Sequence, residues 1–354
     1  MEKKSHQVLY RKYRPVSFGE VLGQEMVVAS LQDTISTSRI SHAYLFAGSR
    51  GTGKTSVARI FAREIGTSEN DTIEIDAASN RGIDDVRALR EGVSALPFDS
   101  KYKVYIIDEV HMLTKEAFNA LLKTLEEPPR HVIFILATTE IGRLPETVVS
   151  RCQVMRFKKP DIKVLTKAVD AISRKEGYSI DSGAAVMIAL SGEGSFRDTL
   201  GALERVIGSV SGKKIGEEAA LAITGAPRAD LLRGFIAALA LRDGDKAFEA
   251  LQKAARGGVQ ARIFTDLILR SVRFVMLLKY SPNIEKEIAE DISADELAFY
   301  KEIAKNAPGI NSQTLLVLLD ALDAVGYSFS PTLPLEIAVA KICFEGNSAP
   351  AARQ

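Results

Sequence analysis

The stretch that decides the fold is "AYLFAGSRGTGKTSVARIFAREI", residues 43–65. It begins as an apolar strand, continues as a glycine-rich turn over residues 48–55, and ends as a helix. The turn fits the pattern G-x-x-x-x-G-K-[ST] in the strand–loop–helix context that a phosphate-binding loop requires. A glycine-rich turn that matches by chance is the alternative, and the correct flanks on both sides favour the phosphate loop.

The turn offers several kinds of phosphate contact. Glycines allow backbone N–H groups to point inward around phosphate oxygens, and the N-terminus of the following helix adds a favourable potential. Lys54 is expected to reach the β- and γ-phosphates, and the Thr55 hydroxyl is expected to bind Mg²⁺. The sequence therefore predicts a nucleoside triphosphate as the ligand, bound together with Mg²⁺. The other predicted ATP-binding residues of the turn are Gly48, Ser49, Arg50, Gly51, Thr52 and Gly53.

Three further apolar runs, "TIEIDA", "YKVYIID" and "HVIFILATT", are short and rich in β-branched or aromatic residues, as strands are. Helical stretches lie between the runs, such as residues 115–127, where apolar side chains recur with a period of 3.6. Apolar strands that alternate with helices indicate an α/β domain with a parallel sheet covered on both faces.

Two carboxylates, Asp108 and Glu109, end the apolar run "VYIIDE". This places them at the carboxyl edge of the sheet, where open α/β folds bind ligands. We expect Asp108 to bind Mg²⁺ and Glu109 to activate a water for attack on the γ-phosphate. Acidic pairs after strands also serve as helix N-caps, and the phosphate loop is what favours catalysis here.

The strand "HVIFILATT" ends in Thr138 and Thr139. Side chains alternate across a sheet, so only one of the two faces the nucleotide. That hydroxyl would hydrogen-bond the γ-phosphate or the attacking water. The alternative is that both threonines only favour the strand.

Arg197 stands on the first turn of a predicted helix in "GSFRDTL". Ser195 and Asp198 have the spacing of a capping box, which accounts for them structurally. Arg197 would reach the nucleotide phosphates and couple their presence to the angle of a small domain. A solvated surface arginine is the alternative.

The pattern changes after Pro160, and helical periodicity then continues to the end of the chain with a second break at Ala226–Pro227. The fold class is therefore α/β followed by all-α. We predict an α/β nucleotide-binding domain over residues 1–158 and a small helical domain over 159–225. A larger helical domain over 226–345 and a flexible tail over 346–354 complete the prediction.

Composition narrows the class of protein. The chain of 354 residues has 46 basic and 45 acidic residues, so its net charge of +1 neither favours nor excludes nucleic acid. Its 2 cysteines are too few for a disulfide framework, which predicts a reducing, cytoplasmic setting. No apolar signal region and no run of roughly 20 apolar residues is present, so no membrane partner is expected.

Several segments, in the order of a known family, carry a resemblance. They include "YRKYRPVSFGEVLGQE", "IEIDAASNRGIDDVR", "LLKTLEEPP", "SRC" and "GSFRDTL", together with the phosphate loop. The chain resembles the AAA+ clamp-loader ATPases and, within them, the gamma/tau family of bacterial DNA polymerase III. "LLKTLEEPP" and "SRC" are specific to clamp-loader-like proteins, whereas the phosphate loop alone is not. The resemblance spans residues 10–200 and weakens beyond about residue 225, where the chain only matches a helical collar.

The resemblance assigns roles that the residues alone leave open. It implies an AAA+ P-loop domain with a helical lid and a helical collar for oligomerisation. Thr139 becomes the sensor threonine, and Arg197 becomes a second sensor acting in cis. Arg151 of "SRC" becomes an arginine that acts in trans on the neighbouring subunit's nucleotide. The residues that resemble those flanking the adenine are Tyr13, Arg14, Pro15 and Val21.

One departure concerns zinc. The family's gamma/tau members usually carry a four-cysteine zinc module between the phosphate-loop helix and the next strand. Here that connection is "GTSEND", residues 66–71, without cysteine, so no zinc is predicted.

The resemblance implies an ATP-driven subunit that opens a sliding clamp and loads it onto primer-template DNA. Expected partners are delta- and delta-prime-like subunits, further copies of this chain, the clamp and the DNA, in a nucleoid-associated location. Arg81 and Arg87 are candidate DNA contacts, although arginines with acidic neighbours such as these more often form a mixed solvated face. Alternatives are a branch-migration helicase, a small subunit of replication factor C type, or a structural role without turnover.

Overall fold

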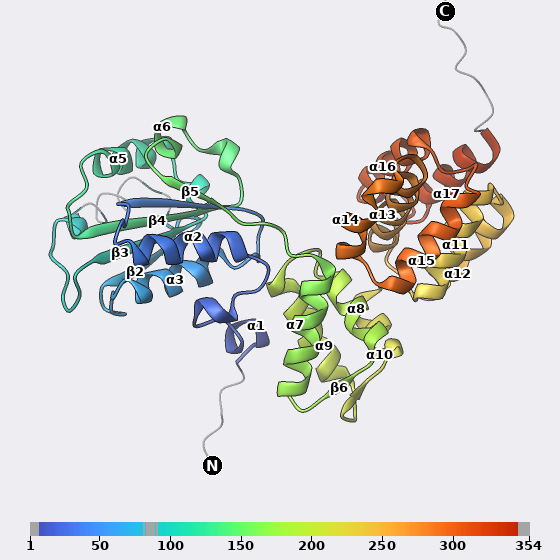
Figure 1. Ribbon diagram of the computed structural model, residues 1–354, viewed down its shortest axis with the longest axis horizontal. Coiled ribbons are helices and arrows are strands. Elements are labelled where there is room, and N and C mark those ends of the chain that lie inside the picture. Colours follow the sequence, from blue (N-terminus) through green and yellow to red (C-terminus); the bar gives the residue numbers. More distant parts are fainter. Residues whose placement is uncertain (1–6, 81, 83–88, 90, 346–354) are drawn as a thin grey trace, which may run out of the picture. The chain divides into compact units, whose positions relative to one another are not determined.

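The computed structural model describes residues 7–80, 82, 89 and 91–345. The chain forms two compact units (Figure 1). The first unit contains the residues up to 164 together with 194–197, and the second contains 165–193 and the residues from 198 onward. The candidate DNA contacts Arg81 and Arg87 and the predicted tail, 346–354, lie outside the described residues.

The first unit is built on a five-stranded sheet of order β2-β3-β4-β1-β5, in which every pair is parallel. The prediction of a parallel sheet is therefore confirmed. The four predicted runs form four of the strands, and a short fifth strand adds an edge beside β1. The strands are β1 (Ala43–Ala47), β2 (Thr72–Asp76), β3 (Lys103–Asp108), β4 (Val132–Thr138) and β5 (Gln153–Arg156).

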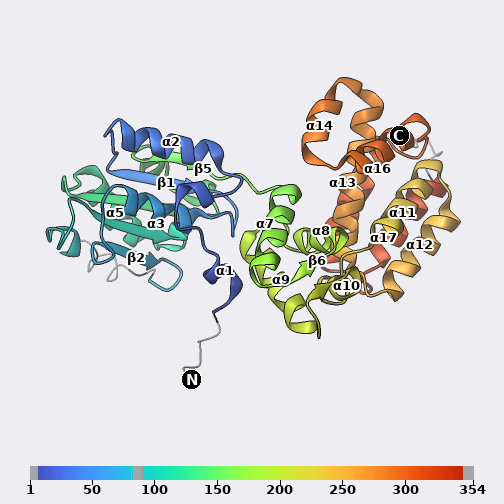
Figure 2. The same cartoon turned by 60° about the horizontal axis from the view of Figure 1, so that its bottom comes forward.

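Helices cover both faces of this sheet (Figures 1 and 2). On one face, α2 (Glu25–Ser36) and α3 (Lys54–Glu64) bury an apolar core that includes Phe46 and Phe61. On the other face lie α5 (Lys115–Glu126) and α6 (Glu146–Val149), and the core there includes Phe118 of α5 and Val148 of α6. The central strands β1 and β4 are buried along their whole length, because both of their faces are covered.

Short elements connect these layers in the first unit. They are α1 (Leu9–Lys12), η1 (Phe18–Glu20), η2 (Val110–Met112) and η3 (Ile141–Arg143).

A buried carboxylate, Asp71, organises the amino edge of the sheet. It stands directly before β2, is 1% exposed, and accepts hydrogen bonds from the backbone N–H groups of Phe98, Asp99 and Ser100 at 2.6–2.9 Å. Burial alone would raise the pKa of Asp71, but these hydrogen bonds lower it to about 2. The carboxylate therefore holds the approach to β3 against the start of β2.

The second unit is almost entirely helical. A two-stranded parallel ribbon, β6 (Ser179–Ile180) and β7 (Lys214–Ile215), accompanies its first helices, which are α7 (Ile162–Lys175), α8 (Ser182–Ser191), α9 (Phe196–Ser209) and α10 (Glu217–Thr224). The later helices are α11 (Ala229–Leu241), α12 (Gly244–Arg256), α13 (Ala261–Tyr280), α14 (Glu285–Asp291), α15 (Ala294–Lys305), α16 (Ser312–Val325) and α17 (Leu333–Ala340), with η4 (Pro282–Ile284) and η5 (Lys341–Glu345).

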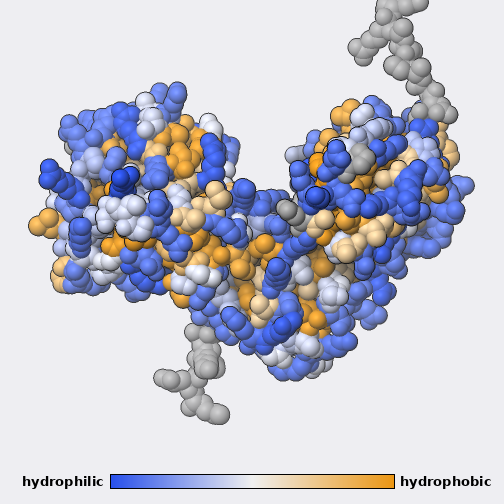
Figure 3. Space-filling view, viewed as in Figure 1, coloured by the Kyte–Doolittle hydropathy of each residue, from blue (hydrophilic) through white to orange (hydrophobic). Residues whose placement is uncertain are grey.

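The later helices share one hydrophobic core that runs from Phe235 to Ile342. The expected boundary near residue 225 falls inside the second unit, so the division of the helical part into two domains stays a prediction. Figure 3 shows a mostly hydrophilic face with hydrophobic residues gathered in several places. Within the described part of the chain, no helix combines the length and apolarity needed to cross a membrane.

Candidate nucleotide-binding site

The phosphate loop joins β1 to α3 as the sequence predicts. Gly51 and Gly53 have φ values of +72° and +99°, a region that glycine occupies without strain. The Gly48 N–H donates to the carbonyl of Thr138 at 3.1 Å, which fixes the start of the loop to the end of β4. Backbone N–H groups and the N-terminus of α3 thus meet at the carboxyl edge of the sheet.

Two loop glycines also allow neighbouring chain segments to approach. A Cβ on Gly48 would collide with the backbone carbonyl of Phe157, and a Cβ on Gly51 would collide with the side chain of Ser195. The Phe196 N–H donates to the Gly51 carbonyl at 3.0 Å. The segment that carries Arg197 is therefore packed directly on the phosphate loop.

Lys54 lies in the loop, 5% exposed, with Nζ donating to the carbonyls of Gly48 at 2.7 Å and Ser49 at 3.0 Å. Burial lowers the pKa of Lys54, the Glu109 and Asp108 carboxylates oppose that shift, and Arg197 adds to it. Two carboxylates and a second cation are thus close enough to act on the lysine.

Thr55 and Asp108 are brought together across the gap between α3 and β3. The Thr55 hydroxyl donates to Asp108 Oδ2 at 2.8 Å. A hydroxyl and a carboxylate side by side are oxygen ligands of the kind that Mg²⁺ takes beside nucleotide phosphates. The predicted pair therefore fits this metal.

Glu109 sits at the turn that follows β3, with φ +49° in the left-handed region. Its Oε2 accepts a hydrogen bond from the Thr139 hydroxyl at 3.0 Å, and its side chain is 29% exposed. A carboxylate that is partly exposed and held by one hydroxyl can accept a proton from a water. Of the two threonines that end the run, Thr139 is the one beside Glu109.

The side chain of Thr138 points away from that of Thr139, because side chains alternate along a strand. Its side chain is completely buried, and Oγ1 lies 3.0 Å from His111 Nδ1. His111 was not recognised in the sequence, because a histidine after an acidic pair has no periodicity that marks it. Glu140 was missed for the same reason, and its Oε1 lies 3.5 Å from His111 Nε2.

Arg197 is the second residue of α9. Its guanidinium lies 5.6 Å from the centre of the Tyr10 ring. Arg14, predicted to flank the adenine, is in the same neighbourhood. Burial lowers the pKa of Arg14, and the charges of Arg59 and Arg197 lower it further. The first unit therefore gathers several cations near the phosphate loop.

The remaining residues of the predicted adenine-flanking arm lie along the same unit. Tyr13 ends α1, and Val21 follows η1 and packs against the core under α2 and α3. Gln24 ties this arm to the site, because its Nε2 donates to the Lys158 carbonyl at 2.7 Å and to the Thr52 carbonyl at 3.4 Å. Pro15 belongs to the connection between α1 and η1.

Arg151 lies apart from all of these residues. It precedes β5, whose Arg156 pairs with Ala47 at the end of β1, so Arg151 is at the amino edge of the sheet and the phosphate loop is at the carboxyl edge. Its guanidinium donates to Glu126 Oε1 and to the Thr147 carbonyl, both at 2.7 Å. The side chain is 34% exposed. Arg151 is therefore not part of this chain's own phosphate site.

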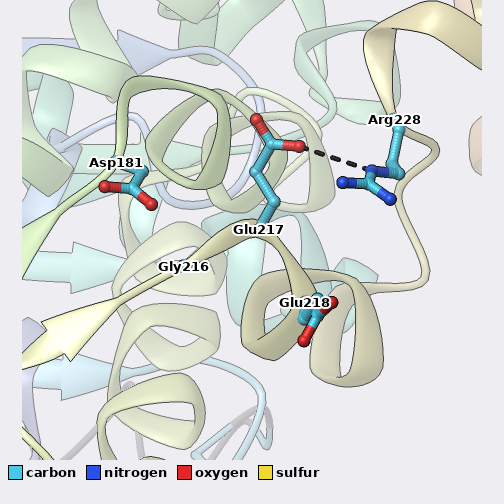
Figure 4. Close-up of a pocket in the computed structure, with 5 residues that line it drawn as sticks. All are labelled: Asp181, Gly216, Glu217, Glu218 and Arg228. Atoms are coloured by element: carbon cyan, nitrogen blue, oxygen red, sulfur yellow. Dashed lines mark ion pairs between the residues drawn. The ribbon is translucent and has the colours of Figure 1, made fainter.

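A different concave surface lies in the second unit (Figure 4). This pocket of about 370 Å³ is lined by Asp181, Gly216, Glu217, Glu218 and Arg228. Arg228 Nε is 3.6 Å from Glu217 Oε2, so the one cation of the lining is already paired with a carboxylate. Three carboxylates repel a polyphosphate, and the pocket is unsuited to ATP.

Comparison with known proteins adds to this geometry. The family described as "DNA polymerase III, delta subunit" matches residues 23–81 and 68–161. The chain is 38% identical over 96% of its length to DNA polymerase III subunit tau of Bacillus subtilis and 36% identical over 88% to that of Escherichia coli. It spans 63% and 52% of the lengths of these two relatives, less than two thirds of either.

A solved structure supports the fold alone. The RuvB Holliday junction branch migration motor of Thermotoga maritima superposes with a TM-score of 0.52 at 23% identity, covering 64% of this chain and 79% of that one. The sheet and the phosphate loop thus define a P-loop α/β fold, joined to a largely helical second unit. More specifically, the chain is homologous to the tau and gamma/tau subunits of bacterial DNA polymerase III.

Proposed function

We propose that this protein is an ATPase of a clamp loader, the assembly that opens a sliding clamp and places it on primer-template DNA. The observation that carries the ATPase assignment is the hydrogen bond between Thr55 and Asp108 beside the Glu109–Thr139 pair. This hydrogen bond joins the phosphate loop to the candidate metal ligand Asp108. The candidate base, Glu109, is the next residue in the chain. The homology to tau and gamma/tau subunits supports the clamp-loader assignment.

The loop binds the triphosphate through the backbone N–H groups of residues 48–53 and through Lys54. Thr55 and Asp108 would hold Mg²⁺, which would neutralise charge on the phosphate oxygens when bound. The arm that carries Tyr13, Arg14, Pro15 and Val21 flanks the adenine.

Glu109 orients the attacking water and accepts its proton. Thr139 keeps the carboxylate in place through the 3.0 Å hydrogen bond and senses the γ-phosphate. Arg197 reaches the phosphates in cis from the first turn of α9, which the Phe196–Gly51 hydrogen bond holds on the loop.

Arg151 completes the site of a neighbouring subunit. Its side chain is partly exposed at the opposite edge of the sheet, where it contacts Glu126 and the Thr147 carbonyl, and this position suits action in trans. An arginine supplied in trans is worth ~10³–10⁵ in the rate of phosphoryl transfer. Contacts that pair one edge with the opposite edge are heterologous and build rings or open spirals.

The partners of such an assembly are delta- and delta-prime-like subunits, further copies of this chain, the sliding clamp and primer-template DNA. The decisive experiment measures ATP hydrolysis by the assembly with and without a sliding clamp and primed DNA. Strong stimulation by both together is expected. Hydrolysis that responds to DNA junctions but not to a clamp would favour a branch-migration motor, and no hydrolysis at all would reject the ATPase assignment.

A further inference from the structure

His111 is a buried polar side chain for which the proposed reaction has no use. It lies in η2, two residues after Glu109, and its side chain is 5% exposed. Its Nδ1 lies 3.0 Å from Thr138 Oγ1 and 3.5 Å from Glu109 Oε2, while its Nε2 lies 3.5 Å from Glu140 Oε1. Burying an imidazole costs free energy unless its nitrogens are satisfied, so this arrangement is specific.

The hydroxyl of Thr138 fixes the ring. Thr138 Oγ1 accepts a hydrogen bond from the Glu140 N–H at 3.0 Å. The same hydroxyl can still form a hydrogen bond with His111 Nδ1, because it has a further lone pair and a proton. Either atom of that pair serves as donor, depending on the tautomer of the ring. Glu140, at the other nitrogen, is itself held by Arg143 Nε at 2.8 Å. Thr138 therefore contacts one ring nitrogen at hydrogen-bond distance, and Glu140, just after β4, lies near the other.

The two threonines at the end of β4 thus engage the same turn by different routes. Thr139 bonds Glu109 directly, and Thr138 bonds the ring that stands beside Glu109. The backbone of Glu109 is in the left-handed region, so no regular element directs its side chain. The imidazole Nδ1 and the Thr139 hydroxyl both lie close to Glu109 Oε2, at 3.5 Å and 3.0 Å.

We propose that His111 is a positioning residue for the Glu109 carboxylate. The ring links the turn after β3 to the end of β4 and so fixes Glu109 relative to Thr139. This inference rests on the proposed function, because it assumes that Glu109 is the base. A base displaced by about 1 Å loses roughly 10²-fold in rate. Loss of the ring should therefore slow turnover without weakening ATP binding.

The chain allows a matched pair of substitutions. In His111→Asn, the amide overlays the position of Nδ1 and preserves the contacts with Thr138 and Glu109. In His111→Gln, the amide overlays Nε2 and reaches Glu140 instead. We expect clamp- and DNA-stimulated turnover at saturating ATP to fall about 10–100-fold in His111→Gln and less than about threefold in His111→Asn. ATP affinity, measured by titration with a fluorescent ATP analogue, should stay within about twofold of the parent in both.

His131 provides the control, because it stands at the opposite end of β4 with Nε2 3.2 Å from the carbonyls of Val93 and Ala95. His131→Gln should hydrolyse ATP at the parent rate. Combining His111→Gln with Glu109→Gln should add little to the loss caused by Glu109→Gln alone, because both act through one carboxylate.

Each result decides a different question. Parent-like turnover in His111→Gln, an equal fall in ATP affinity and turnover, or fully additive losses in the double variant would each overturn the positioning role. A parent assembly that binds ATP but never hydrolyses it would instead reject the proposed function, and with it this inference.

Discussion

The two edges of the central sheet hold acidic side chains in opposite ways. At the amino edge, Asp71 is buried, and both of its carboxylate oxygens accept hydrogen bonds from backbone N–H groups. At the carboxyl edge, Glu109 is partly exposed and accepts one hydroxyl, and Asp108 faces the Thr55 hydroxyl. The difference separates a carboxylate that builds the fold from carboxylates that are free to act on a bound group.

The same comparison applies to arginine. Arg197 is packed beside the phosphate loop at the carboxyl edge, whereas Arg151 is at the amino edge with a side chain that is 34% exposed. The proposed function therefore assigns the carboxyl edge of the sheet to the chain's own nucleotide and the amino edge to a neighbour's. Substitutions at the two edges should therefore have different effects on ATP hydrolysis and ATP binding.

The largest effect is expected at the amino edge. Arg151→Ala should lower clamp- and DNA-stimulated hydrolysis by ~10³-fold or more, because the trans arginine stabilises charge in the transition state. ATP binding by the isolated chain should stay close to that of the parent. Mixing this variant with Lys54→Ala, whose own site is disabled but whose Arg151 is intact, should restore part of the turnover. Mixtures without any recovery would contradict action in trans.

The next largest effect belongs to the carboxyl edge. Glu109→Gln should reduce hydrolysis by ~10²–10⁴-fold, because the amide cannot accept the proton of the attacking water. ATP should still bind and still promote clamp binding, which a pull-down with the clamp would measure. Hydrolysis at the parent level would exclude Glu109 as the base.

A stability effect distinguishes the structural carboxylate. The difference between 3.8 and about 2 in the pKa of Asp71 corresponds to roughly 2 kcal/mol of unfolding free energy. Because the folded-state pKa is the lower one, this stabilisation is present above about pH 4 and is lost as pH falls toward 2. Asp71→Asn should therefore lower stability at pH 7, with a difference from the parent that shrinks in acid. Urea denaturation would measure it, with the exposed Asp99→Asn as a control near zero.

The smallest effect concerns the ion pair at Arg151. Glu126→Ala removes the carboxylate that Arg151 contacts at 2.7 Å, and exposed pairs of this kind contribute about 0.2–1 kcal/mol. We expect stimulated hydrolysis to stay within about threefold of the parent, because Arg151 itself remains. A loss as large as that of Arg151→Ala would mean that Glu126 holds the arginine in its active geometry.

Sequence patterns predicted the parts of this site that are local. The phosphate loop, the strand before Asp108 and the helix over residues 115–126 depend on neighbouring residues, and the structure confirms these elements. Alternation along β4 predicted that Thr138 and Thr139 diverge, but Thr139 was chosen by resemblance alone. The geometry adds the turn at Glu109, which brings its carboxylate to Thr139.

The residues that were missed depend on partners far along the chain. His111 acquires its meaning from Thr138 and Glu140, which are 27 and 29 positions away. Asp71 is satisfied by backbone groups 27–29 positions later, and nothing in the short stretch around it marks a buried carboxylate. Such contacts follow from which strands pair, and local sequence patterns do not reveal the pairing order.

The parallel register of β1 and β5 has a further consequence for an assembly. The phosphate loop begins where β1 ends and Arg151 stands just before β5 begins, so the strands themselves separate the two positions. β1 has 5 residues, which at about 3.3 Å each amounts to roughly 17 Å. In the proposed head-to-tail assembly, strand length would set how far Arg151 lies from its own chain's phosphate loop along the sheet.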